Sequence, residues 1–360
     1  MDTLTHALSG ALLARATAPT SPGPGELTLH ARMTVGFVAA AFPDSDFVLR
    51  AVDTLTYITL HRGVTHSVIL LPAWALLLAW VISHLFRLSP LSSRRYSWRA
   101  IYGAAALGIG IHIAGDVITS YGTMLLAPFS RRGFSAPFTF IIDPYFTAII
   151  AAGLLIGVYK PKSRMPAVAA LLVLVCYVGF QGFLHSRAVE IGEAYVEDRG
   201  LIEAEVDAFP QPLSPFNWKI IVTQGDEYYV ALVNLLRTRS LRLPTRSNGM
   251  LAMWERIAAG YQPVSEAVWI RYKRFGEIGA HAVLAHEAWQ QDIFARFRHF
   301  AKFPVVDKIE FIGSGGVCIS FLDLRFTIPS LPPSLVFGLC RETPRHPWRL
   351  ERDRGLFGRE

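Results

Sequence analysis

Polar side chains able to bind a metal stand directly before the first long apolar run of this sequence. Two imidazoles, a guanidinium and two hydroxyls occur in the segment His61-Arg62-Gly63-Val64-Thr65-His66-Ser67, and an apolar run over 68–86 follows. That run has about the length a helix needs to cross a bilayer. Polar groups at the mouth of such a helix are unfavourable unless water, a metal or an opposite charge meets them. The segment therefore indicates a site at one membrane face.

His112 and Asp116 lie near the end of the next long apolar run, 100–118. Because they are four residues apart, they project from one face of a helix, as helical metal ligands do. An ionised aspartate in hydrocarbon costs roughly 2.5–3.5 kcal/mol or more, so it needs a partner there. A helical hairpin with its turn at 87–99 returns Asp116 towards His66. We expect these residues to share one site.

Further acids and imidazoles gather at the same predicted end of the chain. The first 120 residues contain six acids, and four of them, Asp2, Asp44, Asp46 and Asp116, fall there, as do four of the six histidines. Mixed His and Asp ligation suits Zn²⁺, Mn²⁺ or Fe, and more than four ligands allow two metals. His66 stands near a helix start, whose dipole favours the neutral imidazole that a metal requires. The alternative for the whole cluster is a structural polar network that joins helices. Taken alone, Asp44 and Asp46 follow a proline and are consistent with capping the segment that begins near Phe47.

The apolar segments predict an α-helical membrane region. Two short helical segments are expected at 2–15 and 33–42, and both are too short to cross a bilayer. Four long transmembrane helices are expected at 67–86, 100–118, 144–159 and 166–184. The loops at 87–99 and 160–165 are basic and share one side of an antiparallel bundle, which the positive-inside rule makes cytoplasmic. The polar cluster and the chain after residue 186 are then expected on the other side.

The charge balance changes where the last apolar run ends. Residues 1–186 hold 13 Lys and Arg against 7 Asp and Glu, whereas the remainder holds 22 against 21. The positive charge therefore belongs to the membrane half and reflects topology, so no direct nucleic-acid partner is expected. We expect a membrane domain over 1–186, a soluble α+β domain with a mainly antiparallel sheet over 187–344, and a disordered charged tail over 345–360.

Hairpins in the soluble part are predicted where alternating segments flank 224–227 and 313–316. A helix is predicted over 279–300 and an edge strand over 335–340. The three cysteines, Cys176, Cys318 and Cys340, form no metal pair or redox motif. Cys318 and Cys340 would be able to pair in an extracytoplasmic domain, but inert buried thiols are the expectation.

The polar motifs together resemble those of the YdjM-like family of inner-membrane proteins, described as metal-dependent hydrolases and in part as LexA-binding. The resemblance covers roughly residues 1–185 and rests on Asp2-x-x-Thr5-His6, Pro43-Asp44-x-Asp46, the segment 61–67, and His112-x-x-x-Asp116-x-x-x-x-Tyr121-Gly122. By resemblance, the metal-site positions are His6, Asp44, Asp46, His66, His112 and Asp116. A LexA-type regulator is a partner that only the resemblance implies.

These observations favour an integral membrane hydrolase that uses one or two divalent transition metals, with zinc as the expected metal. The expected catalytic residues are Asp44 or Asp46, which bridge metals or act as general base, and Arg62, which holds an anionic substrate. A site at headgroup depth favours phosphoester or lipid-derived substrates, and membrane lipids are expected partners. The alternative is a non-catalytic membrane scaffold or regulator, whose polar cluster is structural and whose soluble domain binds a partner.

Overall fold

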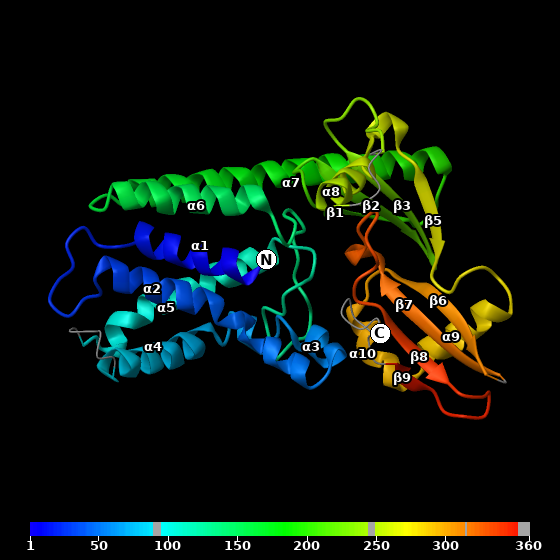
Figure 1. Ribbon diagram of the computed structural model, residues 1–360, viewed down its shortest axis with the longest axis horizontal. Helices are drawn as coiled ribbons and strands as arrows, with labels where there is room; N and C mark the ends of the chain where they lie inside the picture. Colours follow the sequence, from blue (N-terminus) through cyan, green and yellow to red (C-terminus); the bar gives the residue numbers. More distant parts are fainter. Residues whose placement is uncertain (89–94, 244–248, 314, 352–360) are drawn as a thin grey trace. The chain divides into compact units, whose positions relative to one another are not determined.

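The computed structural model describes residues 1–88, 95–243, 249–313 and 315–351 (Figure 1). The chain divides into two units. The helical unit comprises Met1–Val48 and Leu60–Phe183, and the mixed unit comprises Leu49–Thr59 and Leu184–Glu360. The short segment 49–59, which lies inside the predicted membrane domain 1–186, therefore groups with the mixed unit. The domain bounds given above otherwise stay predictions.

Capping residues set the start of helices in the helical unit. Asp2 caps α1 by accepting a hydrogen bond from the Thr5 amide at 3.0 Å, and Asp143 caps α6, which has Pro144 in its first turn. The helices are α1 (Thr3–Ala16), α2 (Leu29–Ala41), α4 (Leu71–Leu88), α5 (Trp98–Val117), α6 (Pro144–Tyr159) and the first half of α7 (Met165–Arg199). Between α2 and α4 lie the 3-10 helices η1 (Pro43–Ala51) and η2 (Val64–His66) and helix α3 (Thr54–Leu60).

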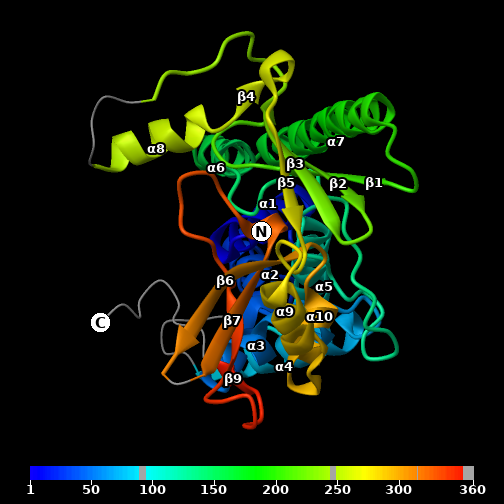
Figure 2. The same ribbon diagram turned by 90° about the vertical axis from the view of Figure 1, so that its right-hand side faces the viewer.

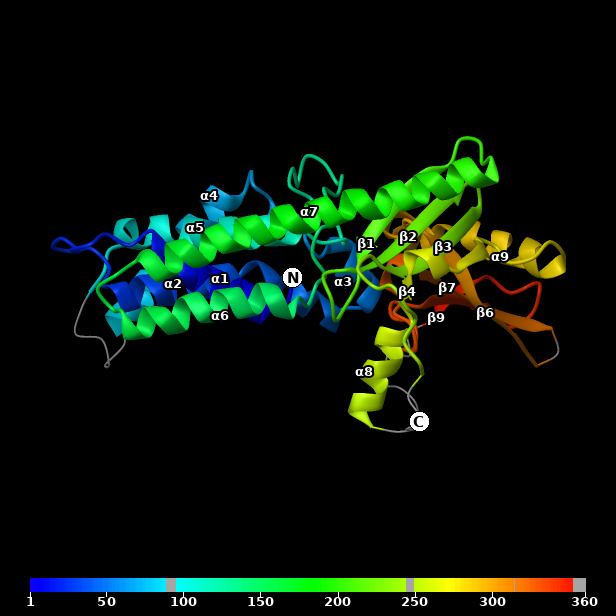
Figure 3. The same ribbon diagram turned by 90° about the horizontal axis from the view of Figure 1, so that it is seen from above.

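Three helices of the described residues are long and apolar enough to cross a membrane: α4, α5 and α7. Helix α6 has the predicted bounds but only 16 residues, so the fourth predicted crossing stays a prediction. Helix α7 runs alongside α6 and continues well beyond it (Figure 3). It ends at Arg199 instead of near residue 184, because its polar second half is rich in Ala, Glu and Arg, which favour the helix without needing lipid.

Helices α1, α2 and α5 approach one another through glycine. A Cβ atom added at Gly36 of α2 would lie 2.5 Å from the carbonyl oxygen of Gly10 in α1. A Cβ at Gly108 of α5 would lie 2.8 Å from the carbonyl oxygen of Gly36. No side chain fits in these contacts, so the three backbones meet directly, as in other close-packed membrane helices. This close approach brings the polar ends of α1 and α5 together.

The described residues of the mixed unit form two sheets. The first has the antiparallel strands β1 (Glu205–Pro210), β2 (Asn217–Gln224), β3 (Glu227–Asn234) and β5 (Trp269–Lys273), with β4 (Gln262–Pro263) parallel to β3. The second is antiparallel throughout: β6 (Pro304–Ile312), β7 (Gly316–Asp323), β8 (Phe337–Arg341) and β9 (Arg349–Glu351). The predicted α+β class is confirmed at this level, with one mixed and one antiparallel sheet.

Helices cover the sheets through apolar side chains. Helices α9 (Ala280–Gln290) and α10 (Ala295–Phe300) lie on the second sheet (Figure 2). Trp289 packs against Phe321, and Phe297 packs against Phe337. A single helix was predicted over 279–300, but the extended backbone of Gln291 separates α9 from the 3-10 helix η4 (Asp292–Phe294) and α10. The remaining elements are α8 (Met250–Ala259), η3 (Val264–Glu266) and η5 (Leu324–Phe326).

Two predictions about the C-terminal part are wrong. Strand β8 is not an edge strand, because β9 pairs with its other side. The predicted disordered tail begins too early, since Trp348 is buried and 349–351 form β9. Strand β9 is too short to show the alternating apolar pattern from which strands were predicted. Residues 352–360 of that tail lie outside the described residues.

The expectation of two buried free thiols is also wrong, because Cys318 and Cys340 form a disulfide. These residues face each other in the register of β7 and β8 and lie 4.0 Å apart between Cα atoms. Spacing along the sequence does not reveal that register, so this pairing was only the alternative to buried thiols, for an extracytoplasmic domain. The third cysteine, Cys176, is free and exposed on α7.

Candidate metal centre

The predicted site residues converge at one end of the helical unit. Helix α1 supplies His6 from its first turns, and α5 supplies His112 and Asp116 from its last. The 3-10 helix η1 supplies Asp44 and Asp46, and the 3-10 helix η2 supplies His66. Among these residues, His6, His66, His112 and Asp116 are fully buried.

Both His66 and His112 direct the same ring nitrogen at the centre. The Nδ1 atom of His112 lies 2.6 Å from the carbonyl oxygen of Ala40, so it carries a hydrogen. The Nδ1 atom of His66 lies 2.9 Å from the hydroxyl oxygen of Thr65, which donates its own hydrogen to Asp46 Oδ2. In the neutral rings, the two Nε2 lone pairs therefore face each other at 2.9 Å. Such a pair is favourable only with a positive charge between the nitrogens.

Two carboxylates complete the centre. Asp116 Oδ2 lies 3.1 Å from Nε2 of His66 and 3.2 Å from Nε2 of His112, yet it receives no hydrogen bond. Asp44 Oδ1 lies 3.8 Å and 3.6 Å from the same two nitrogens. One ligand atom from each of the four residues falls within 4.8 Å of the others. The centre thus presents two imidazole nitrogens and two carboxylate oxygens to one point, a donor set that fits Zn²⁺, Mn²⁺ or Fe.

The carboxylates and imidazoles of the centre shift each other's pKa values. Burial alone would raise the pKa of Asp44, but His66 and His112 hold it below its usual range. Burial alone would lower the pKa of His66, but Asp116 and Asp44 raise it above the ordinary value. The helix dipole predicted a neutral His66, and the carboxylates outweigh that effect. A metal that binds here displaces a proton from the ring.

The second oxygen of Asp116 is held by the protein itself. Its Oδ1 atom accepts hydrogen bonds from the Met1 amino group at 2.7 Å and lies 3.0 Å from His6 Nε2. The guanidinium of Arg62 lies 2.9 Å from the same oxygen. One carboxylate oxygen therefore faces the candidate metal while the other anchors it to α1 and to the segment before η2.

His6 and Asp46 lie next to the four central residues. The ring of His6 stacks on that of His112, with centroids 3.7 Å apart, and its Nε2 faces Asp116. Asp46 Oδ1 lies 2.8 Å from Nδ1 of His61, and its other oxygen accepts from Thr65. Direct ligation by His6 or Asp46 stays a prediction; in the structure, each orients a ligand of the central set.

Arg62 is almost completely buried and has partners within the protein. Its Nη1 atom donates to the Thr119 hydroxyl at 2.7 Å and to the Asp116 carbonyl oxygen at 3.2 Å, and its guanidinium lies over the Tyr121 ring. Its backbone has a φ of 60°, which places its amide against Asp46. The predicted contact with an anionic substrate stays a prediction, and the observed contacts position Asp116.

Sequence reasoning missed several groups that complete the site. Thr119 stands three residues after Asp116 and therefore returns to the same helical end, a spacing that would have identified it. Thr3 donates to Asp44 Oδ2 at 2.6 Å, three residues before His6. The carbonyl of Ala40 has no signal in the sequence, because every residue carries one.

The comparisons with known proteins agree with this geometry. The profile of the family described as YdjM inner membrane protein matches residues 1–188, more than half of the chain, and the chain belongs to that family. The chain is similar to the uncharacterized protein YfhP of Bacillus subtilis (strain 168), with 26% identity over 234 residues, 64% of this chain and 67% of that protein. No solved structure matches the chain. The described spans and the family make it an integral inner-membrane protein.

Proposed function

We propose that this member of the YdjM inner membrane protein family is a metal-dependent hydrolase of phosphoester or lipid-derived substrates. One observation carries the proposal: the buried Nε2 atoms of His66 and His112 meet at 2.9 Å beside an Asp116 oxygen without a hydrogen bond. These three atoms need a cation between them, either a metal ion or the proton that the raised pKa of His66 favours, and the four-residue donor set fits the metal. The donor set favours zinc, with Mn²⁺ and Fe as the alternatives.

Some residues of the centre would hold the metal ion, and others orient the residues that hold it. Asp44, His66, His112 and Asp116 would hold the ion, which when bound supplies Lewis-acid activation of water and of the scissile group. The carbonyl of Ala40 fixes the orientation of His112.

Proton transfer falls to the pair formed by His61 and Asp46, whose Nδ1 and Oδ1 atoms are 2.8 Å apart. The side chain of His61 is 13% exposed, whereas those of His66 and His112 are fully buried. This pair therefore connects the centre with the outside, and it carries the general-base role predicted for Asp46.

The substrate class follows from the position of the centre. It lies where α4 begins and α5 ends, at one end of the candidate spans, which is the depth of lipid headgroups. Esters of phosphate are present at that depth and are accessible substrates for a divalent ion. Membrane lipids are accordingly the proposed partners, and a LexA-type regulator remains a prediction from family resemblance alone.

Replacing Asp46 by asparagine tests catalysis. Asp46→Asn keeps the size of the side chain and an oxygen for Thr65, but it removes the charge that holds the His61 proton. We expect phosphodiesterase or lipid-hydrolysing activity, identified by a substrate screen of the zinc-loaded protein, to fall by about 100-fold or more. Metal content and melting temperature are expected to change little. Thr34→Val, on the exposed surface of α2, is the control.

The alternative function is a non-catalytic scaffold, and the contacts of Asp116 Oδ1 favour it. That oxygen joins α1, α5 and the segment before η2 through Met1, His6 and Arg62. A scaffold predicts that Asp46→Asn lowers stability severely and that no substrate is hydrolysed by the metal-loaded protein. That pair of results would decide against the enzyme.

The disulfide supports the proposed orientation, in which the mixed unit faces away from the cytoplasm. Paired cysteines persist in oxidising compartments and are rare in the cytosol. We expect acid-quenched cells, alkylated after denaturation, to show one free thiol per chain, that of Cys176, and three after reduction. Three free thiols before reduction would place the mixed unit in the cytoplasm. A Cys176→Ser variant confirms which thiol is labelled.

A further inference from the structure

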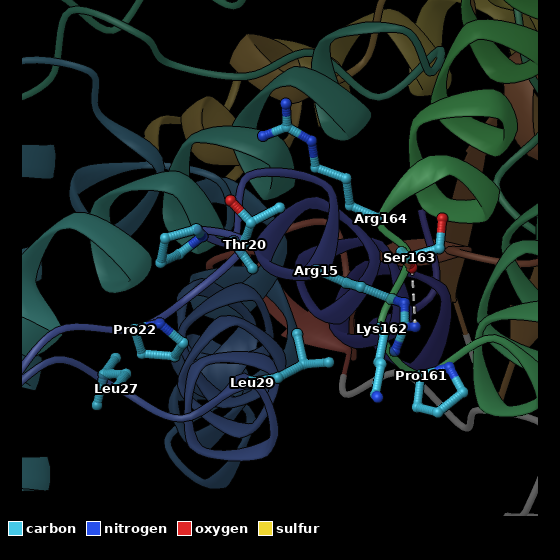
Figure 4. A pocket seen from close by; sticks show the side chains of 11 residues that line it. Arg15, Thr20, Pro22, Leu27, Leu29, Pro161, Lys162, Ser163 and Arg164 are labelled. Carbon is cyan, nitrogen blue, oxygen red and sulfur yellow. Dashed lines mark hydrogen bonds between the residues drawn. The ribbon is translucent and has the colours of Figure 1, made fainter.

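A pocket of about 380 Å³ lies at the opposite end of the helical unit from the metal centre. Its walls come from the connection between α1 and α2 and from the connection between α6 and α7 (Figure 4). The metal centre lies at the start of α1, whereas this pocket lies at its end. None of the residues that line it belongs to the site described above.

Arg15, the last charged residue of α1, forms the inner wall of the pocket and is only 5% exposed. Its Nη2 atom donates to the carbonyl oxygens of Gly157, Lys160 and Ser163 at 2.8, 3.0 and 3.1 Å, and Figure 4 shows the last of these bonds. Its Nε atom is buried without a partner. No carboxylate pairs with Arg15 among the described residues, so only carbonyl oxygens and the Met33 sulfur face its buried positive charge.

Two more cations stand at the pocket, Lys162 and Arg164, and both side chains are exposed. None of the residues that line the pocket is acidic. Glu26 is the one acid of the connection 17–28, and it accepts a hydrogen bond from the Gly23 amide instead. Thr20 and Ser163 add hydroxyl groups to the wall. The lining residues thus offer three cations and two hydroxyl groups, and no acid, to an anion with several oxygens.

The surroundings favour an anion that carries an acyl chain. The last turn of α6 exposes Val158 and Tyr159, and Met165 is exposed where α7 begins. These apolar side chains border the basic connection 160–164, which is the arrangement found where a membrane helix enters the headgroup layer. Pockets of this kind between membrane helices hold the headgroups of anionic lipids.

We propose that this pocket binds a phosphate group, and that the group belongs to the headgroup of an anionic phospholipid. The exposed Lys162 contacts the phosphate oxygens and the buried Arg15 adds positive charge from the inner wall, while the acyl chains lie along the exposed apolar surface of α6 and α7. The site is independent of the metal centre and of its proposed chemistry. It places a lipid at the end of the bundle that the positive-inside rule assigns to the cytoplasm.

Lipid binding by the full chain in neutral detergent tests the proposal. Native mass spectrometry counts the lipids retained during titration with phosphatidylglycerol, with phosphatidylcholine, and with inorganic phosphate. The double variant Lys162→Gln/Arg164→Gln changes the pocket without touching the buried Arg15. The matched control Arg87→Gln/Arg95→Gln removes the same charge from exposed positions outside the pocket.

We expect the wild type to retain one phosphatidylglycerol more tightly than phosphatidylcholine, and the pocket variant to lose about tenfold in affinity while the control does not. Inorganic phosphate is expected to compete only weakly. Phosphate that binds alone and is lost in the pocket variant would support the phosphate site but make free phosphate its ligand. Equal losses in both variants, or equal retention of the two lipids, would overturn the proposal.

Discussion

Replacing Asp116 by asparagine is expected to abolish metal binding and to lower the free energy of unfolding of the helical unit by about 3–5 kcal/mol. The carboxylate is fully buried, and it faces the guanidinium of Arg62, which is also buried. An amide cannot neutralise that guanidinium, and the uncompensated buried charge causes the loss. Thermal or denaturant unfolding in detergent, together with elemental analysis of the purified protein, measures both effects.

Asp44→Asn is the matched control for that experiment. Asp44 presents one oxygen to the same centre, but its side chain is 13% exposed and it has no arginine partner. We expect this variant to lose metal like Asp116→Asn but to unfold within about 1 kcal/mol of the metal-free wild type. Equal destabilisation by both substitutions would show that the cluster is mainly structural. Retention of metal by Asp116→Asn would remove this residue from the set of ligands.

Replacing Gly36 by valine is expected to destabilise the helical unit by about 3 kcal/mol and to weaken metal binding from a distance. A Cβ atom there would lie 2.5 Å from the Gly10 carbonyl oxygen and 2.7 Å from Cβ of Ala14, so α2 must move away from α1. Helix α2 carries the Ala40 carbonyl that orients His112. Loss of that hydrogen bond is expected to reduce metal affinity about 10–100-fold, as measured by competition with a chelator.

Gly103→Val is the control for this packing effect. It introduces the same side chain into α5, at a position where an added Cβ meets nothing within 4 Å. We expect unchanged metal affinity and a change in stability of less than about 1 kcal/mol. Normal metal affinity in Gly36→Val would show that the separation of α1, α2 and α5 does not control the centre.

The helices of the membrane half were predictable, because apolar length and capping residues act locally. The prediction of 144–159 has the bounds of α6, where Asp143 and Pro144 set the start. The predicted bounds were correct, but at 16 residues α6 is shorter than the three candidate spans. The end of α7 was predicted too early, because apolarity marks contact with lipid, whereas the helix continues through residues of high helix propensity.

The convergence of His66, His112, Asp44 and Asp116 was also predictable, because a helical hairpin returns its ends to one side. The distinction between ligand and supporting residue was not. His6 and Asp46 have the same chemistry as the ligands, and only three-dimensional placement puts them beside the centre. The φ of 60° at Arg62 and the role of the Ala40 carbonyl are backbone features, and the residue types at these positions do not predict them.

The same limit explains the errors in the mixed unit. Cys318 and Cys340 are 22 residues apart, and their pairing depends on the register of β7 with β8. Strand β9 has three residues, too few for an alternating pattern, and it forms by antiparallel pairing with β8. The disulfide and strand β9 therefore depend on pairing between strands, which local sequence patterns do not reveal.

The metal content of the purified full chain tests the central claim most directly. Protein extracted without chelators is expected to carry at least one equivalent of a divalent transition metal per chain by elemental analysis. The double variant His66→Ala/His112→Ala is expected to carry none, because it removes both imidazole ligands of the centre. A folded wild type that is free of metal and takes up neither Zn²⁺, Mn²⁺ nor Fe²⁺ would contradict the account.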